Sequence, residues 1–313
     1  MAEAETTETE RRGEAPDAAA PDAAAPDEAA YAPSGDPPRN ASAASASEAD
    51  SASEEDSASA EVQPKGSGPP PEGTIIELRD LYKSFGALDV LNGASLSVEK
   101  GTSAVVMGGS GAGKSVLLKH VVKLLTPDEG EPWVKGRRVD EMSGDELDDL
   151  RLSIGYLFQG GALFDSMSVR ENMNFFLNRH SDLSEDERED RIEETLSWVN
   201  LAHTASKFPA ELSGGQQKRV GLARAIILQP EILLYDEPTT GLDPVSVRTV
   251  AELIVRLRDE RGITSVAITH DLLCADIITD RAHFIYEGEI LESGTLDELK
   301  RSDHPTLRNF FGD

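Results

Sequence analysis

Residues 108–115 read Gly-Gly-Ser-Gly-Ala-Gly-Lys-Ser, and this stretch decides the fold. It directly follows an apolar run at 104–107 and opens a second, helix-like run that begins at Val116. A strand, a glycine-rich turn and a helix in that order are typical of a phosphate-binding loop. The glycines let successive backbone N–H groups turn inward around phosphate oxygens, where the helix N-terminus adds positive potential. The pattern predicts that Lys114 reaches the β- and γ-phosphates of a nucleotide and that the Ser115 hydroxyl binds Mg²⁺.

A second apolar run, residues 232–237, reads Ile-Leu-Leu-Tyr-Asp-Glu and delivers two adjacent carboxylates to the end of a predicted strand. Their expected roles differ. We expect Asp236 to hold Mg²⁺ through its water shell, and Glu237 to polarise the water that attacks the γ-phosphate. The two runs together indicate a site that hydrolyses a nucleotide.

A third stretch, residues 212–216, reads Leu-Ser-Gly-Gly-Gln and precedes a helix-like run. Ser213 and two glycines at a helix start form another surface of backbone N–H groups that favours anions. One chain therefore has two phosphate-facing elements of different design, and a single nucleotide need not contact both.

Short apolar runs alternate with helical ones from residue 75 onward, which favours an α/β domain with a buried, largely parallel sheet. The strand-like runs lie at 94–98, 104–107, 232–235 and 265–268, and the segment 284–291 predicts a hairpin. Capping-box spacing predicts helix starts at Ser143, Ser184 and Thr295. Asp243 before a proline predicts another helix start, and Gly262 its end.

The first 72 residues differ in composition from the rest of the chain. They hold 17 acidic and 4 basic side chains among Ala, Ser and Pro, too few apolar groups to offset the entropy of ordering. We therefore expect a disordered acidic tail at 1–72, a linker that ends at the prolines 69–71, and a folded domain at 73–313. The net charge of −28 disfavours nucleic acid as a partner, since polyanions bind positive surfaces.

Two further features bear on location. Cys274 is the single cysteine, so no internal disulfide forms and a reducing compartment is expected. The chain has no apolar leader and no apolar run of about 18 residues, so we expect no secretory signal and no membrane span of its own.

These motifs, in this order, resemble the nucleotide-binding subunits of ATP-binding-cassette (ABC) transporters over residues 73–313. Walker A corresponds to 108–115, Walker B to 232–236, the signature to 212–216 and the D-loop to 241–243. Gln159 matches the Q-loop glutamine, and His270 matches the switch histidine. The resemblance implies a RecA-like parallel-sheet core of the P-loop NTPase class, an antiparallel β subdomain and a helical signature subdomain at about 159–225.

The resemblance also implies a set of site residues and two cofactors, ATP and Mg²⁺. Lys114, Gln159, Glu237 and His270 would be catalytic, and Ser115, Gln159 and Asp236 would bind the metal. Phe85 matches the aromatic residue that stacks on adenine. The expected nucleotide-binding residues are Phe85, Gly108, Gly109, Ser110, Gly111, Ala112, Gly113, Lys114, Ser115, Val116, Ser213, Gly214, Gly215, Gln216 and Asp243.

For the assembly, the resemblance implies a head-to-tail dimer of two copies, with each ATP held between Walker A of one copy and the signature of the other. The run 156–172, with Gly-Gly-Ala-Leu-Phe-Asp at 160–165, is similar to ATPases of Mla-type and mammalian-cell-entry (Mce) lipid transporters. That branch implies an integral-membrane permease, an Mce-type lipid-binding protein, and a peripheral position on the cytoplasmic side of the inner membrane. Phe164, Met167 and Val169 are the expected permease contacts.

Three other functions are compatible with parts of the pattern. An ABC importer ATPase for amino acids or another polar solute would share every catalytic motif, and only the 160–172 region and the carboxyl end argue against it. A non-transport ABC ATPase usually has two cassettes or a long coiled-coil insertion. A phosphate-loop kinase or GTPase would lack the signature and the switch histidine.

Overall fold

The computed structural model describes residues 68–312, so almost all of the predicted acidic tail and Asp313 lie outside the described residues. The strands are β1 (Thr74–Phe85), β2 (Leu88–Glu99), β3 (Ser103–Met107), β4 (Glu129–Val134), β5 (Arg137–Arg138), β6 (Ile154–Leu157), β7 (Ile232–Asp236), β8 (Thr264–Ile268), β9 (Arg281–Tyr286) and β10 (Glu289–Gly294). The α-helices are α1 (Lys114–Val121), α2 (Asp145–Leu152), α3 (Val169–His180), α4 (Glu185–Trp198), α5 (Gly214–Ile226), α6 (Pro244–Arg261), α7 (Leu272–Ile278), α8 (Leu296–Lys300) and α9 (Pro305–Phe311). Two 3₁₀ turns, η1 (Ala202–Thr204) and η2 (Pro209–Glu211), precede α5.

The central sheet has six strands in the order β10-β9-β3-β8-β7-β6. Strands β9, β3, β8, β7 and β6 are parallel, and β10 pairs antiparallel with β9 as the predicted hairpin. Every residue of β3, β7 and β8 is buried, which explains why these strands read as continuous apolar runs in the sequence. The predicted largely parallel sheet is confirmed.

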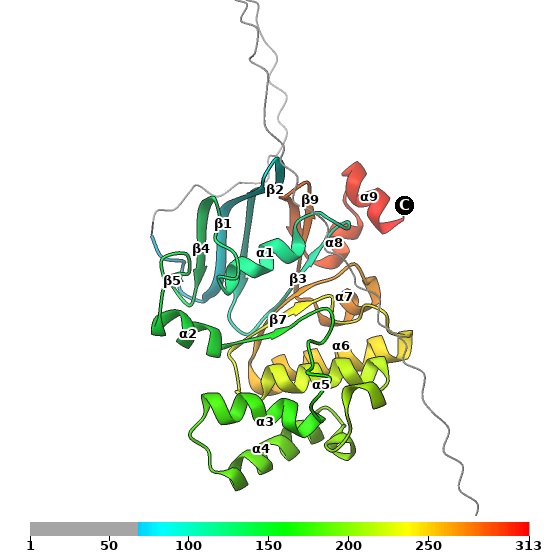
Figure 1. Ribbon diagram of the computed structural model, residues 1–313. Helices are drawn as coiled ribbons and strands as arrows, with labels where there is room; N and C mark the ends of the chain where they lie inside the picture. Colours follow the sequence, from blue (N-terminus) through cyan, green and yellow to red (C-terminus); the bar gives the residue numbers. More distant parts are fainter. Residues whose placement is uncertain (1–67, 313) are drawn as a thin grey trace, which may run out of the picture. The chain divides into compact units, whose positions relative to one another are not determined.

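Alternation along the strands divides the buried residues into two cores. Val105 and Met107 of β3 face one core, and Ala104 and Val106 face the other. The first core includes residues of α5, α6 and α7, whereas the second includes residues of α1, β1 and β2. Figure 1 shows this layering: α1 and the strands β1, β2 and β4 lie on one side of β3 and β7, and α5 and α6 on the other.

A second, antiparallel sheet has the order β2-β1-β4-β5. The helices α3, α4 and α5 contact one another and lie between β6 and β7 in the chain. In Figure 1 they form the green part below the central sheet. This arrangement brings the carboxyl ends of β3, β6 and β7 to one edge of the central sheet, where the candidate site residues begin.

The helix caps test the predicted helix starts one by one. Ser184 and Thr295 form capping boxes, Asp243 accepts hydrogen bonds from two backbone N–H groups of α6, and Gly262 ends α6 with φ 65°. The prediction for Ser143 is wrong, because Gly144 takes the cap position with φ 57°. Three acidic residues in the first turn supply the negative charge at the start of α2.

No helix within 68–312 is long and apolar enough to cross a membrane.

Candidate nucleotide site

The phosphate loop, residues 108–115, joins the end of β3 to the start of α1. Glycine is required at two of its positions by close backbone neighbours. A Cβ at Gly108 would lie 2.2 Å from the Ile285 carbonyl oxygen, and one at Gly113 would lie 2.8 Å from the Val90 carbonyl oxygen. At Gly109 and Gly111 a Cβ would meet nothing within 4 Å, so the middle of the loop is open. The loop therefore combines fixed ends with an open backbone surface, which suits a phosphate group.

The Lys114 ammonium folds back over this loop. Its Nζ donates hydrogen bonds to the carbonyl oxygens of Gly108 (2.9 Å) and Gly109 (2.8 Å), and the residue is 8% exposed. Burial lowers the pKa of Lys114, and the carboxylates of Glu237 and Asp236 oppose that shift. A buried ammonium that is held only by neutral carbonyl groups and distant carboxylates is well placed to attract phosphate oxygens.

Ser115 and Asp236 lie together at the base of the loop. The Ser115 hydroxyl donates to Asp236 Oδ1 at 3.1 Å, which links the first turn of α1 to the last residue of β7. Burial raises the pKa of Asp236, and the Ser115 hydrogen bond opposes the shift. A hydroxyl beside a carboxylate matches the oxygen donors that Mg²⁺ prefers. The described residues contain no group of three or more His, Cys, Asp or Glu side chains that could hold a metal by themselves.

Glu237 follows β7 directly and has φ 51°, in the left-handed region. Its backbone N–H donates to the Ile268 carbonyl at 3.0 Å, which ties it to the end of β8. His270 Nδ1 lies 3.0 Å from the Glu237 carboxylate, and Thr240 Oγ1 donates to Glu237 Oε2 at 3.2 Å. The structure thus brings Glu237 and His270 together. It also places the Thr240 hydroxyl on the Glu237 carboxylate, a contact that nothing in the sequence around Thr240 indicated.

Gln159 lies in the exposed loop after β6, the strand that pairs with β7. Its backbone carbonyl is contacted by the ammonium of Lys218, which also donates to the Glu237 carbonyl oxygen at 3.4 Å. Sequence reasoning missed Lys218. The signal was present, because Lys218 lies four residues before Leu222 and eight before Ile226, on the buried face of the helix.

The signature segment, residues 212–216, leads into α5, whose buried apolar residues belong to the first core, whereas those of α1, the helix that follows the phosphate loop, belong to the second. Ser213 caps α5: Gln216 N donates to Ser213 Oγ at 3.3 Å, and Ser213 N donates to Gln216 Oε1 at 3.0 Å. Gly214 begins α5 with Leu242 as its near neighbour, and Gly215 lies against Ser246, next to the α6 cap Asp243. Within the described part of the chain, no hydrogen bond joins Ser213 or Gln216 to the phosphate loop.

Phe85, expected to stack on adenine, ends β1 and is 46% exposed. The ammonium of Lys83 lies 5.7 Å from the centre of its ring. The exposed part of the ring could receive a flat apolar surface. Val116 is part of α1 and packs partly buried against the second core.

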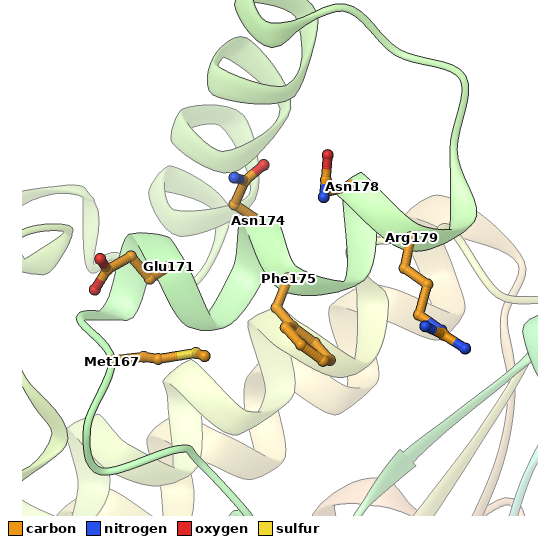
Figure 2. A pocket seen from close by; sticks show the side chains of 6 residues that line it. All are labelled: Met167, Glu171, Asn174, Phe175, Asn178 and Arg179. Carbon is orange, nitrogen blue, oxygen red and sulfur yellow. The ribbon is translucent and has the colours of Figure 1, made fainter.

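A pocket of about 300 Å³ lies along α3. Figure 2 shows the side chains that line it: Met167, Glu171, Asn174, Phe175, Asn178 and Arg179. Phe175 is 43% exposed, and its ring packs 5.2 Å from that of Phe164, which is 39% exposed. Val169 is fully buried in the first core, so its expected permease contact is wrong. The apolar side chains available for such a contact are instead Phe164, Met167 and Phe175.

The family model described as "ABC transporter" matches residues 91–240. The Arabidopsis thaliana "Protein TRIGALACTOSYLDIACYLGLYCEROL 3, chloroplastic" is 41% identical over 75% of this chain and 73% of its own length. The Haemophilus influenzae "Intermembrane phospholipid transport system ATP-binding protein MlaF" is 36% identical over 73% of this chain and 86% of its own.

Other relatives are named for polar substrates. A "Probable ribonucleotide transport ATP-binding protein" of Mycobacterium leprae is 38% identical over 78% of this chain and 71% of its own. A Listeria monocytogenes "Methionine import ATP-binding protein" is 37% identical over 76% of this chain and 72% of its own length. Among solved structures, a dimeric ATP-binding cassette in a post-hydrolysis state bound to ADP and phosphate is similar, with TM-score 0.65, 31% identity, and coverage of 71% of this chain and 99% of that one.

Proposed function

This chain belongs to the ABC transporter family of ATP-binding subunits, and on that premise we propose that it powers the transport of lipid or another hydrophobic molecule by an Mla- or Mce-type membrane complex. The chain binds and hydrolyses ATP, as its family does. The observation that carries the catalytic assignment is the cluster of Lys114, Ser115, Asp236, Glu237 and His270 at the carboxyl ends of β3, β7 and β8.

Each residue of this cluster has a distinct task. Lys114 would hold the β- and γ-phosphates, and the exposed ring of Phe85 would stack on the base. Ser115, Asp236 and Gln159 would bind Mg²⁺, which, when bound, neutralises charge that develops on the phosphates. Glu237 would accept the proton of the attacking water, with His270 and Thr240 orienting its carboxylate.

Replacement of Glu237 by Gln tests the catalytic assignment, because it keeps the size of the side chain and removes its basicity. We expect the rate of ATP hydrolysis to fall by about 100-fold or more, with ATP still bound. Hydrolysis by Glu237→Gln at the wild-type rate would falsify the role of this carboxylate.

A second copy would complete the nucleotide site. In one chain, the backbone N–H surface of Ser213, Gly214 and Gly215 lies apart from the phosphate loop, although both suit phosphate. Head-to-tail pairing would place the signature segment of one copy against the nucleotide of the other, beside Asp243. Hydrolysis would remove the γ-phosphate between the copies and let them separate.

The pocket along α3 is the proposed docking surface for a cytoplasmic helix of the permease. Its lining combines the exposed ring of Phe175 and the thioether of Met167, which can pack against another helix, with the polar side chains of Glu171, Asn174, Asn178 and Arg179. It also follows the chain segment that begins at Gln159, so the docked helix would be linked through the backbone to this site residue. This contact would hold the chain on the cytoplasmic side of the inner membrane, and an Mce-type lipid-binding protein would belong to the same complex.

The choice of lipid rests on the resemblance of residues 156–172 and on the two relatives whose names refer to a glycolipid and to phospholipid transport. The methionine importer shares the fold and the ATPase motifs, so an amino-acid importer is the second candidate.

One experiment separates these candidates. The full chain is isolated with its membrane partners from detergent-solubilised membranes, and co-purifying small molecules are identified by mass spectrometry. We expect a permease and a stoichiometric lipid, whereas a periplasmic amino-acid-binding protein without lipid would contradict the proposal.

The same isolation tests the docking surface: the permease should no longer co-purify with the Phe175→Glu variant. Leu152→Glu is the matched control, because Leu152 is 38% exposed and lies outside the pocket.

A further inference from the structure

Lys218 is a charged residue buried in the middle of the molecule, with 7% of its surface exposed. It lies on α5, two residues after the signature segment. Lysine is almost never buried to this degree without a partner, because desolvation of an ammonium is costly. Burial lowers the pKa of Lys218, and the carboxylates of Asp236 and Glu237 oppose that shift. Its position therefore needs a reason other than packing.

The hydrogen-bond partners of Lys218 supply one. Among the described residues, its Nζ contacts the backbone carbonyls of Gln159 and Glu237, the second at 3.4 Å. These carbonyls follow β6 and β7, which are neighbours in the sheet. One ammonium thus joins the backbones of two residues that are proposed to act on Mg²⁺ and on the attacking water.

The Glu237 backbone needs such a partner more than most. Its φ of 51° is uncommon for a residue with a side chain, so the surrounding contacts must hold the conformation. Only two donors of the described residues reach its carbonyl oxygen: Lys218 Nζ, and Thr240 N at 3.4 Å. Without the ammonium, Thr240 N is the one donor of the described residues left to this carbonyl, so the direction of the Glu237 side chain is less restricted.

Lys218 is also the first of three residues of α5 that contact residues 159–162, the segment that follows β6. Gly221, three residues on, leaves room for Gly161, whose carbonyl oxygen would lie 3.2 Å from a Cβ there. Arg224, three further on, donates to the Gly161 carbonyl at 3.2 Å and contacts that of Ala162. Residues three apart on a helix share a face, so one side of α5 holds the segment 159–162.

We propose that Lys218 is a positioning residue for ATP hydrolysis, which holds the Glu237 backbone in its left-handed conformation and ties it to that of Gln159. This inference rests on the proposed catalytic role of Glu237. A cation is required because a neutral side chain of similar length would give weaker hydrogen bonds to two carbonyl groups. Lys218 would act through the backbones of Gln159 and Glu237, whose carbonyl oxygens are the acceptors of its ammonium among the described residues.

The test compares the purified full-length chain with Lys218→Gln and Lys218→Arg. We expect Lys218→Gln to lower kcat by about 10- to 100-fold, because a small misplacement of a catalytic group costs that much. The number of ATP molecules bound per chain and their affinity should stay within about twofold, since the phosphate loop is unchanged. Lys218→Arg should retain more activity than Lys218→Gln, because the guanidinium still donates to carbonyl groups.

Two controls separate positioning from loss of structure. Arg188→Gln removes a cation of α4 that donates to the carbonyl of Leu183, which is not one of the catalytic or nucleotide-binding residues. It should lower the thermal midpoint and leave kcat per bound ATP unchanged. The double variant Lys218→Gln/Glu237→Gln should be no slower than Glu237→Gln alone, because Lys218 acts through Glu237.

Each outcome has one meaning. If Glu237→Gln abolishes hydrolysis but Lys218→Gln keeps the wild-type kcat, the role of Lys218 is wrong and the proposed function stands. The role of Lys218 is equally wrong if the two single effects multiply in the double variant. If Glu237→Gln itself hydrolyses ATP at the wild-type rate, the proposed catalytic site fails first.

Discussion

At the scale of single residues, the site consists of charged groups that the fold holds in costly positions. Lys114 is buried over neutral carbonyls, Asp236 is buried beside the Ser115 hydroxyl, and Glu237 is held in a left-handed conformation. Each of these positions is favourable only when a polyphosphate, a cation or a reacting water offsets the cost. The structure therefore indicates binding chemistry rather than structural ion pairs.

The sequence could predict the members of this cluster but not all of their neighbours. Lys114, Ser115, Asp236 and Glu237 are indicated by local patterns, since glycine spacing and a strand end determine their surroundings. Lys218 is different, because the carbonyl groups that it contacts belong to residues 59 and 19 positions away in the sequence. The spacing of Lys218 along α5 indicates a buried face, but the carbonyl groups that it meets there depend on how α5 packs against β6.

Lys114→Ala tests the residue scale through affinity. Loss of a charge-assisted contact should cost about 1.5–3 kcal/mol, which weakens ATP binding by roughly 10- to 150-fold. Titration with a fluorescent ATP analogue measures the change. Lys123→Ala is the control, because the Lys123 ammonium donates to the Met142 carbonyl away from the site. Equal affinity of Lys114→Ala and the wild type would contradict the assignment.

At the scale of elements, close approaches of backbones fix how the helices meet the central sheet. A Cβ at Gly155 in β6 would lie 2.3 Å from the Ala225 carbonyl oxygen of α5. The parallel strands themselves were predictable from their continuous apolar runs, as were the caps at Ser184, Thr295 and Asp243. The cap at Ser143 was not, since a glycine with a positive φ competes for the same helix start.

Gly155→Ala tests this packing. The added methyl group meets both the Ala225 carbonyl and the Leu233 side chain, so we expect a loss of about 1–3 kcal/mol in the free energy of unfolding. Urea denaturation followed by circular dichroism gives the value. Gly160→Ala should be nearly neutral, because a Cβ there meets nothing within 4 Å. Equal stability of the two variants would show that α5 and β6 are not packed this closely.

At the scale of the whole molecule, buried histidine makes stability depend on pH. Burial lowers the pKa of His283 to about 4, and its Nδ1 lies 2.8 Å from the Ser293 hydroxyl. In the unfolded chain the imidazole has a pKa near 6.5. Between these values the unfolded state binds more protons than the folded state, so stability rises with pH in this window.

The expected loss between pH 7 and pH 5 is about 2 kcal/mol from His283 alone. Urea denaturation at both pH values, for the wild type and His283→Asn, isolates this contribution from that of the many carboxylates. Asparagine can keep a hydrogen bond to Ser293 but does not titrate. The wild type should lose about 2 kcal/mol more than His283→Asn on acidification, and parallel losses would refute the contribution of His283.

The assembly also belongs to this scale, because the phosphate loop and the signature segment lie apart in a single chain. The sequence shows both elements, but the distance between them follows only from the fold. ATP is therefore expected to join two copies, each of which supplies half of the surroundings of the triphosphate.

The most direct test is the molar mass of Glu237→Gln, measured by light scattering during gel filtration with Mg²⁺ and either ATP or ADP. We predict a mass twice that of the 33.7 kDa chain with ATP and a single chain with ADP. Ser213→Glu, added to the same variant, should prevent the doubling while leaving ATP bound to the phosphate loop. A mass of one chain with ATP bound to Glu237→Gln would contradict the central claim.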